Sequence, residues 1–575
     1  MRLTHLRVER FRGVLSLDWP VPDRLTCLVG PGDSSKTTVL DAISLLGSTR
    51  TAAFSDYDFH GATTAAGPIL IEGVFADLPE PLLADNRFGL DLIGVDSRGV
   101  AQGEPGEHEP AIRIRLDVDA SLEPVWRILS ARNPEGRVLT ARDRAALAIS
   151  RLGDAPERQF NLARGSALSR AIAQPDDVAE VLAEAYRAAR SAVHGTDLSA
   201  LDPAVHLAAT TSTVMGAGEI SESLEISLEV SPTTAGGLTL HSGAIPVRAS
   251  GLGTRRLVAL GIELGSNEAG SIVCIDELEH GLEPHRTRHL VRSLRTLVTP
   301  VDGSSSGHVV FTSHSPVILS ELGHQGVAVV HSHGGCLDIR DVPSGLVAVV
   351  RAAPDALLAK RVVIGEGKTE VGLVRAHDRR WAVGHNGESL AHRGVAIIEG
   401  GGNEAPKRAL ALANLGFEVL LLADSDVPLD PDIHALEASG VSVVVWDGAV
   451  CTEQRVLTDL SWQGMKQAFD LVVSDPDREA PSVMDAILAS PEGTAALKRL
   501  GVARSDCGVD LDAALAAGIH EEELRQAFSS ASVKRKWFKR IDSGEALGDI
   551  LAADIHAATQ ASGQAMVLVE SFSYA

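Results

Sequence analysis

The sequence predicts an α/β chain with two to four domains, and three observations lead to this expectation. With 575 residues, the chain is too long to fold around a single hydrophobic core. Near residue 30, a glycine-rich turn joins a short apolar run to a helical pattern, as in nucleotide-binding α/β domains. From residue 361 onward, apolar runs of strand length alternate with helical patterns, which predicts a parallel sheet with helices on both faces.

The composition is that of a soluble globular protein, with 45% hydrophobic and 22% charged residues. No uninterrupted apolar run reaches membrane-spanning length, and the N-terminus lacks the apolar core of a signal peptide. The five cysteines are scattered and form no CxxC pair, which favours reduced thiols in a cytoplasm. With a net charge of −24, the chain as a whole repels phosphate, so any surface that binds nucleic acid must be local.

The turn near residue 30 has the pattern of a phosphate-binding loop, in the sequence GPGDSSKTTVLDAISLL. Gly30, Lys36 and Thr37 stand at the required spacing, Thr38 follows, and Gly32 within the loop is a further candidate for ATP binding. In such a loop, backbone N–H groups surround the phosphates, the lysine reaches the β- and γ-phosphates, and a hydroxyl binds Mg²⁺. Ser35 stands where the pattern has a glycine, so we expect ATP to bind and to turn over slowly. Taken alone, the loop could also be a Gly/Ser-rich helix cap with a chance lysine.

Three later motifs support the nucleotide-binding interpretation. An apolar strand ends in Asp276 and Glu277, residue types that hold Mg²⁺ and orient the attacking water in P-loop ATPases. Another apolar strand is followed by His314, where a sensor of the γ-phosphate would lie. Upstream, Ser250 and Gly251 begin a helix, which predicts a phosphate-binding nest.

In this order, the motifs resemble the ABC-type ATPases of the RecF/SMC-like group, and the resemblance covers residues 1–345. Residues 140–215 are Ala-rich and helical in period, between the strand-like IRIRLDV and LEISLEV. In such ATPases, helices at this place often form a dimerisation insert, so the resemblance implies at least a homodimer. A helical lobe that packs on its own domain is the alternative.

The second half begins after a Pro-containing segment, which we interpret as a linker at residues 346–360. Residues 361–575 then form the second domain, with a helical insertion at about 475–530. Reactive groups of parallel sheets gather at the carboxyl ends of the strands. Four carboxylates follow two of the predicted strands: Glu366, Glu370, Asp424 and Asp426.

Carboxylates that are crowded together repel one another, and divalent cations relieve this repulsion. Oxygen ligands without nearby His or Cys suit Mg²⁺ or Mn²⁺. Two such ions can activate water and stabilise the leaving oxygen of a phosphodiester. The sequence therefore predicts a site for two ions at the carboxyl edge of this sheet.

The pattern GEGxxE…DxD, with a glycine-rich turn at Gly400–Asn403 between its parts, resembles the Toprim fold of topoisomerases, primases and some nucleases. Behind an ABC-type ATPase, it resembles the OLD (overcoming lysogenisation defect) family of ATPase–Toprim nucleases. The order and length of the chain are also similar to the nuclease subunit of the Gabija anti-phage system.

The OLD resemblance implies roles for further residues. Glu453 matches a ligand of the second metal, and a solvated glutamate at a helix start is the alternative. In the basic segment SVKRKWFKRIDSG, the family has a lysine that stabilises the transition-state phosphate three residues before a Trp. Lys534 matches that position, and Lys536 and Lys539 are rivals. A solvated basic helix face is the alternative for the whole segment.

Together, these resemblances imply an ATP-binding, metal-dependent DNA endonuclease that is regulated by its ATPase domain and acts in cytoplasmic anti-phage defence. A helicase-like partner protein is implied only by the likeness to Gabija. The alternatives are a non-cleaving ATPase sensor that binds nucleic acid, and an OLD nuclease of the DNA-repair type. Topoisomerase activity needs a nucleophilic tyrosine, and none of the three tyrosines lies in a recognisable partner domain.

Overall fold

The computed structural model describes residues 1–49, 53–96, 99–153, 240–242, 245–265, 271–299 and 307–574, with isolated positions between 184 and 191. The chain forms two compact units. The first comprises Met1–Leu25 and Thr37–Phe311, and the second comprises Thr26–Lys36 and Thr312–Ala575. Among the described helices, none is long and apolar enough to cross a lipid bilayer.

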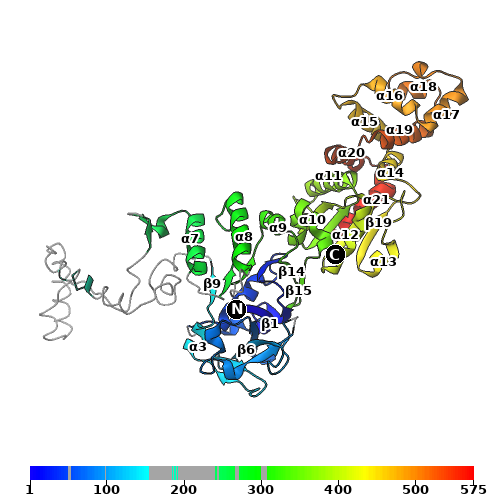
Figure 1. The fold of residues 1–575 in the computed structure, drawn as a ribbon. Helices are drawn as coiled ribbons and strands as arrows, with labels where there is room; N and C mark the ends of the chain where they lie inside the picture. The colour runs from blue at the N-terminus through cyan, green and yellow to red at the C-terminus, as the bar shows by residue number, and fades with distance from the viewer. Residues whose placement is uncertain are drawn as a thin grey trace, which may run out of the picture. The chain divides into compact units, whose positions relative to one another are not determined.

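The first unit contains an antiparallel sheet, shown in blue and cyan in Figure 1. Its strands follow the order β8-β7-β6-β4-β1-β2, and β5 pairs with β6. Alternation in β1 buries Leu6 and Val8 while Arg7 between them is exposed, as period-2 patterning requires. The bounds are β1 Arg2–Phe11, β2 Val14–Pro20, β4 Ile69–Ala76, β5 Ile93–Val95, β6 Glu109–Val118, β7 Pro124–Leu129 and β8 Arg137–Val138.

Three parallel strands carry the predicted ATPase motifs of this unit. They are β9 (Ile149–Leu152), β12 (Ile272–Ile275) and β13 (His308–Thr312), with β12 in the middle. The helices of eight or more residues that are described here are α1 (Lys36–Leu46), α7 (Leu252–Gly265) and α8 (Pro284–Val298). All four residues of β12 are buried, as expected for a strand with neighbours on both sides.

Most of the helical insert predicted at residues 140–215 lies outside the described residues. Its described beginning contains a short helix, α3 (Ala141–Ala145), which starts with a capping box at Thr140. Ile149–Leu152 form the strand β9, so the helical pattern predicted from about residue 140 was wrong at these positions. Parallel pairing with β12 outweighs the local helical pattern there.

In the second unit, β3 (Leu25–Val29) pairs with β14 (Val327–His333), which in turn pairs with β15 (Cys336–Asp341). These strands, assigned from the sequence to the first domain, cluster with the C-terminal half, so the division falls after Phe311. The predicted linker at 346–360 is folded as α10 (Val347–Ala352) and the 3-10 helix η11 (Pro354–Leu358). It is folded because Val350 and Leu357 are buried.

The sheet that carries the carboxylates has four parallel strands in the order β17-β16-β18-β19. Gly365 at the end of β16 is in register with both Glu399 and Leu422, so the carboxyl ends of the strands meet at one edge. The strands are β16 Arg361–Gly365, β17 Val395–Glu399, β18 Glu418–Ala423 and β19 Val441–Val445. The helices between them are α11 Lys368–Gly384, α12 Ala405–Asn414 and α13 Ile433–Ala438.

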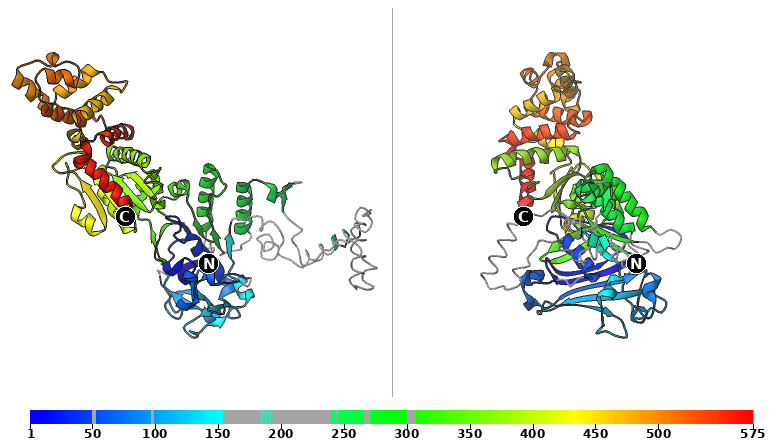
Figure 2. Two further views of the ribbon diagram at one scale, coloured as in Figure 1. Left: turned by 180° about the vertical axis from the view of Figure 1, so that it is seen from behind. Right: turned by 90° about the vertical axis from the view of Figure 1, so that its left-hand side faces the viewer.

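A run of helices follows this sheet, and the predicted insertion at 475–530 falls within it. Helices α16–α19 gather into one group in both views of Figure 2. The run comprises α14 Thr452–Asp459, α15 Trp462–Val473, α16 Ala480–Leu488, α17 Pro491–Leu500, α18 Leu511–Ala516, α19 Glu521–Arg535, α20 Ile541–Ala553 and α21 Ala561–Tyr574.

Helices α11 and α20 lie side by side (Figure 1) and approach each other through glycines. A β-carbon at Gly372 would lie 2.5 Å from the carbonyl carbon of Gly544, and one at Gly548 would lie 2.7 Å from the β-carbon of Ala376. The absence of side chains therefore sets the spacing of the two helices. The loop before α20 carries the basic segment, so this spacing also positions that loop.

We expect Gly372→Ala to lower the apparent melting temperature of the full-length protein, because the added methyl group would force the backbones of α11 and α20 apart. Overpacking of this kind costs about 1–3 kcal/mol. Gly384→Ala, at the far end of the same helix, is the matched control, since a β-carbon there has no neighbour within 4 Å. Equal melting temperatures for Gly372→Ala and wild type would contradict this account of the helix pair.

Candidate active site

The ends of β16 and β18 are tied together by Glu366. Its backbone N–H donates to the carbonyl of Leu422 at 2.8 Å, and its Oε2 accepts the backbone N–H of Asp424 at 2.8 Å. Burial, with the nearby charges of Asp424 and Asp426, raises the pKa of Glu366. Glu366 is therefore held at the shared edge of the sheet, beside other carboxylates.

Glu370 lies in the first turn of α11 and is 1% exposed. Its Oε2 accepts the backbone N–H of Gly367 at 2.7 Å, which closes the start of the helix. Its Oε1 is buried and has no hydrogen-bond partner. Burial and the charge of Asp424 raise the pKa of Glu370 to about 7, so the charge of the ionised carboxylate is not fully compensated at this position.

Asp424 follows β18 and is fixed by Thr452. Its Oδ1 accepts the backbone N–H and the hydroxyl of Thr452, both at 2.7 Å. The Thr452 hydroxyl itself accepts the indole N–H of Trp446 at 2.8 Å, which directs its proton to the carboxylate. Burial raises the pKa of Asp424, although these donors and the charge of Lys539 oppose the shift.

Glu453, in the first turn of α14, is 1% exposed and makes an ion pair. Lys539 Nζ lies 2.9 Å from its Oε1, and the Thr369 hydroxyl lies 2.9 Å from the same oxygen. Burial alone would raise the pKa of Glu453, but the Lys539 ammonium holds it below the usual value. Oε2 is buried without a hydrogen-bond partner.

These four carboxylates share one arrangement: one oxygen of each is anchored by a donor of the protein. The second oxygens of Glu370 and Glu453 are buried and unsatisfied, which is an unfavourable state for an anion. Asp426, two residues beyond Asp424, is exposed and contributes to the raised pKa of Glu366. The structure thus brings together all five carboxylates predicted from the sequence.

The donor set fits a hard divalent cation, since it consists of carboxylate oxygens with unsatisfied charge. Within the described residues, no three Asp, Glu, His or Cys side chains form a ready-made cage. One oxygen each of Glu366, Glu370, Asp424 and Glu453 is held by a donor of the protein, and the second oxygens of Glu370 and Glu453 have no partner.

Of the three candidate lysines, the structure brings only Lys539 to the acidic cluster. Burial would lower the pKa of Lys539, but the charges of Glu453, Glu370 and Asp424 raise it. Lys534, in the last turn of α19, and Lys536, which ends that helix, are exposed. Neither forms an ion pair within the described part of the chain.

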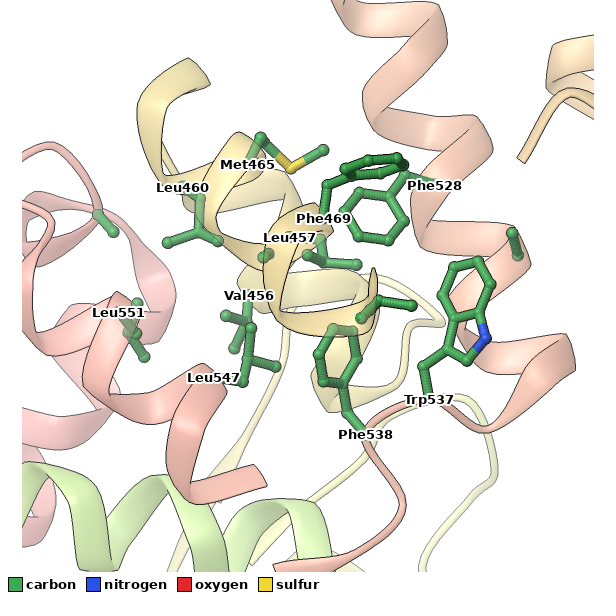
Figure 3. Close-up of a cluster of buried hydrophobic side chains, with 14 of the residues drawn as sticks. Val456, Leu457, Leu460, Met465, Phe469, Phe528, Trp537, Phe538, Leu547 and Leu551 are labelled. Atoms are coloured by element: carbon green, nitrogen blue, oxygen red, sulfur yellow. The ribbon is translucent and has the colours of Figure 1, made fainter. Parts of the chain in front are cut away.

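Packing explains why Lys539 is the one that reaches the cluster. Trp537 and Phe538 are buried in the apolar cluster of Figure 3, together with Phe528 from α19. The carbonyl of Phe538 lies 2.9 Å from the Thr369 hydroxyl. These contacts fix the backbone directly before Lys539, whereas Lys534 and Lys536 precede the anchored aromatic pair.

The predicted phosphate-binding loop leads from β3 into α1. Lys36 is 6% exposed, and its Nζ donates to the carbonyls of Gly30 and Pro31 at 3.1 and 2.7 Å and to Ser34 Oγ at 3.1 Å. Gly30 has a φ of 138°, and a β-carbon there would lie 2.5 Å from the carbonyl oxygen of Val330. The loop is therefore curled around the ammonium group, in the manner of a phosphate cradle.

Ser35 has a φ of 65°, in the left-handed region that favours glycine. The residue therefore occupies a backbone position suited to the glycine of the usual pattern. Gly32 is exposed with no neighbour for a β-carbon within 4 Å, and Thr38 is half-buried at the start of α1.

Asp276 follows β12 and faces the start of α1. Its Oδ1 accepts the hydroxyl of Thr37 at 3.3 Å, and its Oδ2 pairs with Arg151 of β9 at 2.9 Å. Arg151 also pairs with Asp41 of α1. The threonine and the aspartate of the predicted Mg²⁺ site are thus adjacent, as the motif requires.

The remaining ATPase residues lie at element ends. Glu277 has a φ of 45° and its Oε2 lies 3.3 Å from Nδ1 of His280. Gly251 is exposed directly before α7, beside half-buried Ser250. His314 is exposed after β13, in the second unit.

Sequence reasoning missed three residues that fix these groups: Thr369, Thr452 and Arg151. The two threonines stand beside predicted ligands, in GEGKTE and VCTEQ, and this adjacency was the available signal. No such signal pointed to Arg151, because it is distant in sequence from Asp41 and Asp276, the two carboxylates that it contacts.

Two family models match the chain. Residues 25–320, more than half of it, match a family described as "AAA domain, putative AbiEii toxin, Type IV TA system". Residues 357–426 match the family "Overcoming lysogenization defect protein-like, TOPRIM domain". This second match includes the first four predicted carboxylates.

No curated protein matches the chain in sequence. Among solved structures, an Smc head bound to the C-terminal winged-helix domain of ScpA is similar at 14% identity and a TM-score of 0.34, over 59% of this chain and 97% of that one. A second is an Smc head with an extended coiled coil, bound to a ScpA domain from Pyrococcus furiosus; its identity is 12% and its TM-score 0.31, over 59% of this chain and 95% of that one.

The assignment rests on the two family models and on the arrangement of their motifs in the structure. The α/β ATPase domain precedes a Toprim domain, in the order predicted from the sequence. The chain belongs to the AAA-domain family that its first half matches and, with the Toprim domain behind it, to the OLD family of ATPase–Toprim proteins.

Proposed function

We propose that this protein is a metal-dependent DNA endonuclease whose cutting is regulated by nucleotide in its ATPase domain. One observation carries the proposal: carboxylates at the ends of β16, β18 and β19 each have one oxygen anchored, and two have their second oxygen buried without a partner. A carboxylate cluster that served only the fold would have its charges paired within the protein.

Glu366, Glu370, Asp424, Asp426 and Glu453 would hold two Mg²⁺ or Mn²⁺ ions. When bound, such ions activate water and stabilise the leaving oxygen of a phosphodiester. The backbone N–H of Asp424 and the donors of Thr452 keep Glu366 and Asp424 in place, so little rearrangement of the sheet edge is needed. Such preorganisation is an important source of catalytic power.

Lys539 is the cation that we assign to the transition-state phosphate. Its ammonium group is fixed beside Glu453 and near Asp424 and Glu370, whose charges keep it protonated. A positioned positive charge stabilises the additional negative charge that develops on a phosphate during cleavage. The sequence-based assignment to Lys534 is an alternative that the same experiment tests.

In the ATPase domain, Lys36 would exchange its loop carbonyl partners for the β- and γ-phosphates of ATP, and Thr37 and Asp276 would hold Mg²⁺. Half-buried Ser250 and exposed Gly251, directly before α7, would meet the nucleotide of a second copy. We therefore propose a homodimer or higher oligomer as the form that hydrolyses ATP.

The family assignment and the chain's similarity in layout to the Gabija nuclease subunit suggest a cytoplasmic role in anti-phage defence, with a helicase-like partner. A DNA-repair role of the same nuclease and a non-cleaving sensor are the competing proposals. The four anchored carboxylates, with Asp426 beside them, favour cutting over sensing alone, because a non-cleaving domain has no use for all five.

We expect Glu366→Ala, Asp424→Ala and Asp426→Ala each to abolish Mg²⁺-dependent nicking of plasmid DNA, because each removes a ligand. Glu418→Ala is the matched control: this glutamate begins the strand that ends beside Asp424, and it pairs with Arg361 at the opposite edge of the sheet. Melting temperatures within a few degrees of wild type would show that the folds are intact. Normal nicking by Asp424→Ala would exclude the two-metal site.

For the lysines, we expect Lys539→Ala to reduce the cleavage rate by roughly two to three decades, the contribution of several kcal/mol from a positioned charge. Lys534→Ala and Lys536→Ala should remain within about threefold of wild type, since among the described residues only Lys539 of the three pairs with a carboxylate of the cluster. Single-turnover cleavage at saturating protein measures the effect. An inactive Lys534→Ala with an active Lys539→Ala would restore the assignment made from the sequence.

For the ATPase, we expect Ser35→Gly to raise ATP hydrolysis, because glycine adopts the left-handed conformation at position 35 without strain and leaves more room for phosphate. Lys36→Ala should lose nucleotide binding. Millimolar ATP should then change the cutting rate of wild type and leave that of Lys36→Ala unchanged. The same ATP response in both proteins would show that this loop does not regulate the nuclease.

A further inference from the structure

Arg408, in the first half of α12, lies over the glycine-rich turn that follows β17. A β-carbon at Gly401 would lie 2.6 Å from Nη1 of Arg408 and 3.0 Å from its Cζ, so the guanidinium group rests directly on the backbone of Gly401. The side chain is half-buried. The guanidinium group is therefore held in one place, unlike that of an arginine that extends freely into solvent.

The turn beneath Arg408 is part of the carboxylate edge. The backbone N–H of Gly402 donates to the carbonyl of Glu366 at 2.8 Å, and that of Gly400 donates to the carbonyl of Gly365 at 2.7 Å. Arg408 therefore contacts the same turn that is hydrogen-bonded to Glu366, the first predicted metal ligand. The pKa of Glu366 is raised, and the positive charge that opposes this rise is Lys539, so Arg408 is not the principal counter-ion of that carboxylate.

Within the described part of the chain, Arg408 forms no ion pair and donates no hydrogen bond to another side chain or carbonyl. Its neighbour Lys407 lies 3.8 Å from Glu404 and 3.5 Å from Asp430. Arg361, also in this domain, pairs with Glu418. In a chain with a net charge of −24, an arginine that finds no carboxylate is available for an anion from outside.

We infer that Arg408 binds a backbone phosphate of the DNA strand, next to the phosphate that is cut. This inference rests on the proposed nuclease function and adds a substrate-binding residue outside the metal ligands and Lys539. A guanidinium group presents a planar fork of N–H donors that matches two phosphate oxygens. Its place beside the carboxylate edge puts the positive charge where a strand must pass to reach the ions.

The inference also explains why position 401 is a glycine. Gly401 has a φ of 82°, and any side chain there would collide with the guanidinium group. Gly401→Ala should therefore displace Arg408 from the turn. The loss of DNA binding in Gly401→Ala should depend on the presence of Arg408.

The experiment measures binding of a fluorescently labelled DNA duplex to the full-length protein by anisotropy, in EDTA so that no strand is cut, over a series of KCl concentrations. We expect Arg408→Ala to weaken binding about five- to twentyfold at low salt and to reduce the slope of log K against log [KCl] by about one. Arg408→Lys should retain the salt slope and recover part of the affinity. Lys407→Ala, the matched control, should remain within twofold of wild type.

Equal affinity and equal salt slope for Arg408→Ala and wild type would overturn the inference and leave the proposed nuclease intact. Failure of wild type to bind any DNA, with no cleavage in Mg²⁺, would instead remove the proposed function. When Arg408 is already replaced by Ala, the further substitution Gly401→Ala should weaken DNA binding by less than twofold. An undiminished effect of Gly401→Ala in that background would refute its role in placing the arginine.

Discussion

The structure of the C-terminal half depends on one electrostatic constraint: several carboxylates are buried at the same edge of a four-stranded sheet. Burial raises the pKa values of Glu366, Glu370 and Asp424, and the charge of Lys539 offsets only part of this rise for Glu366 and Asp424. Glu453 is the exception, because Lys539 pairs with it. The fold resists this repulsion by anchoring one oxygen of each carboxylate, and so it keeps an edge that is arranged for cations.

The helices that pack on the sheet determine where Lys539 lies at the same edge. Gly372 and Gly544 allow α20 to approach α11 closely, and the buried side chains of Trp537 and Phe538 fix the loop between α19 and α20. The hydroxyl of Thr369 lies within hydrogen-bond distance of both Glu453 and the carbonyl of Phe538, and donates its one proton to either. Apolar packing thus determines where the ammonium group of Lys539 lies.

In the ATPase motifs, too, the protein's own groups hold the predicted site residues in place. Lys36 donates to carbonyls of its own loop. In the first unit, the Thr37 hydroxyl lies beside Asp276. Ser35 keeps the left-handed conformation of the glycine that it replaces, at the expense of local strain. A loop of this kind is suited to respond to nucleotide occupancy more than to rapid turnover.

The sequence by itself determined the fold class, the order of the two domains and the identity of the five carboxylates, because strand periodicity and motif spacing are local properties of the chain. Only the tertiary structure decided that Lys539 reaches the cluster, that Thr452 orients Asp424 and that Ile149–Leu152 join a sheet. The helical pattern expected at Ile149–Leu152 differs from the observed strand for the same reason. These features depend on packing between segments that are distant in sequence, and local sequence patterns do not indicate which distant segments come into contact.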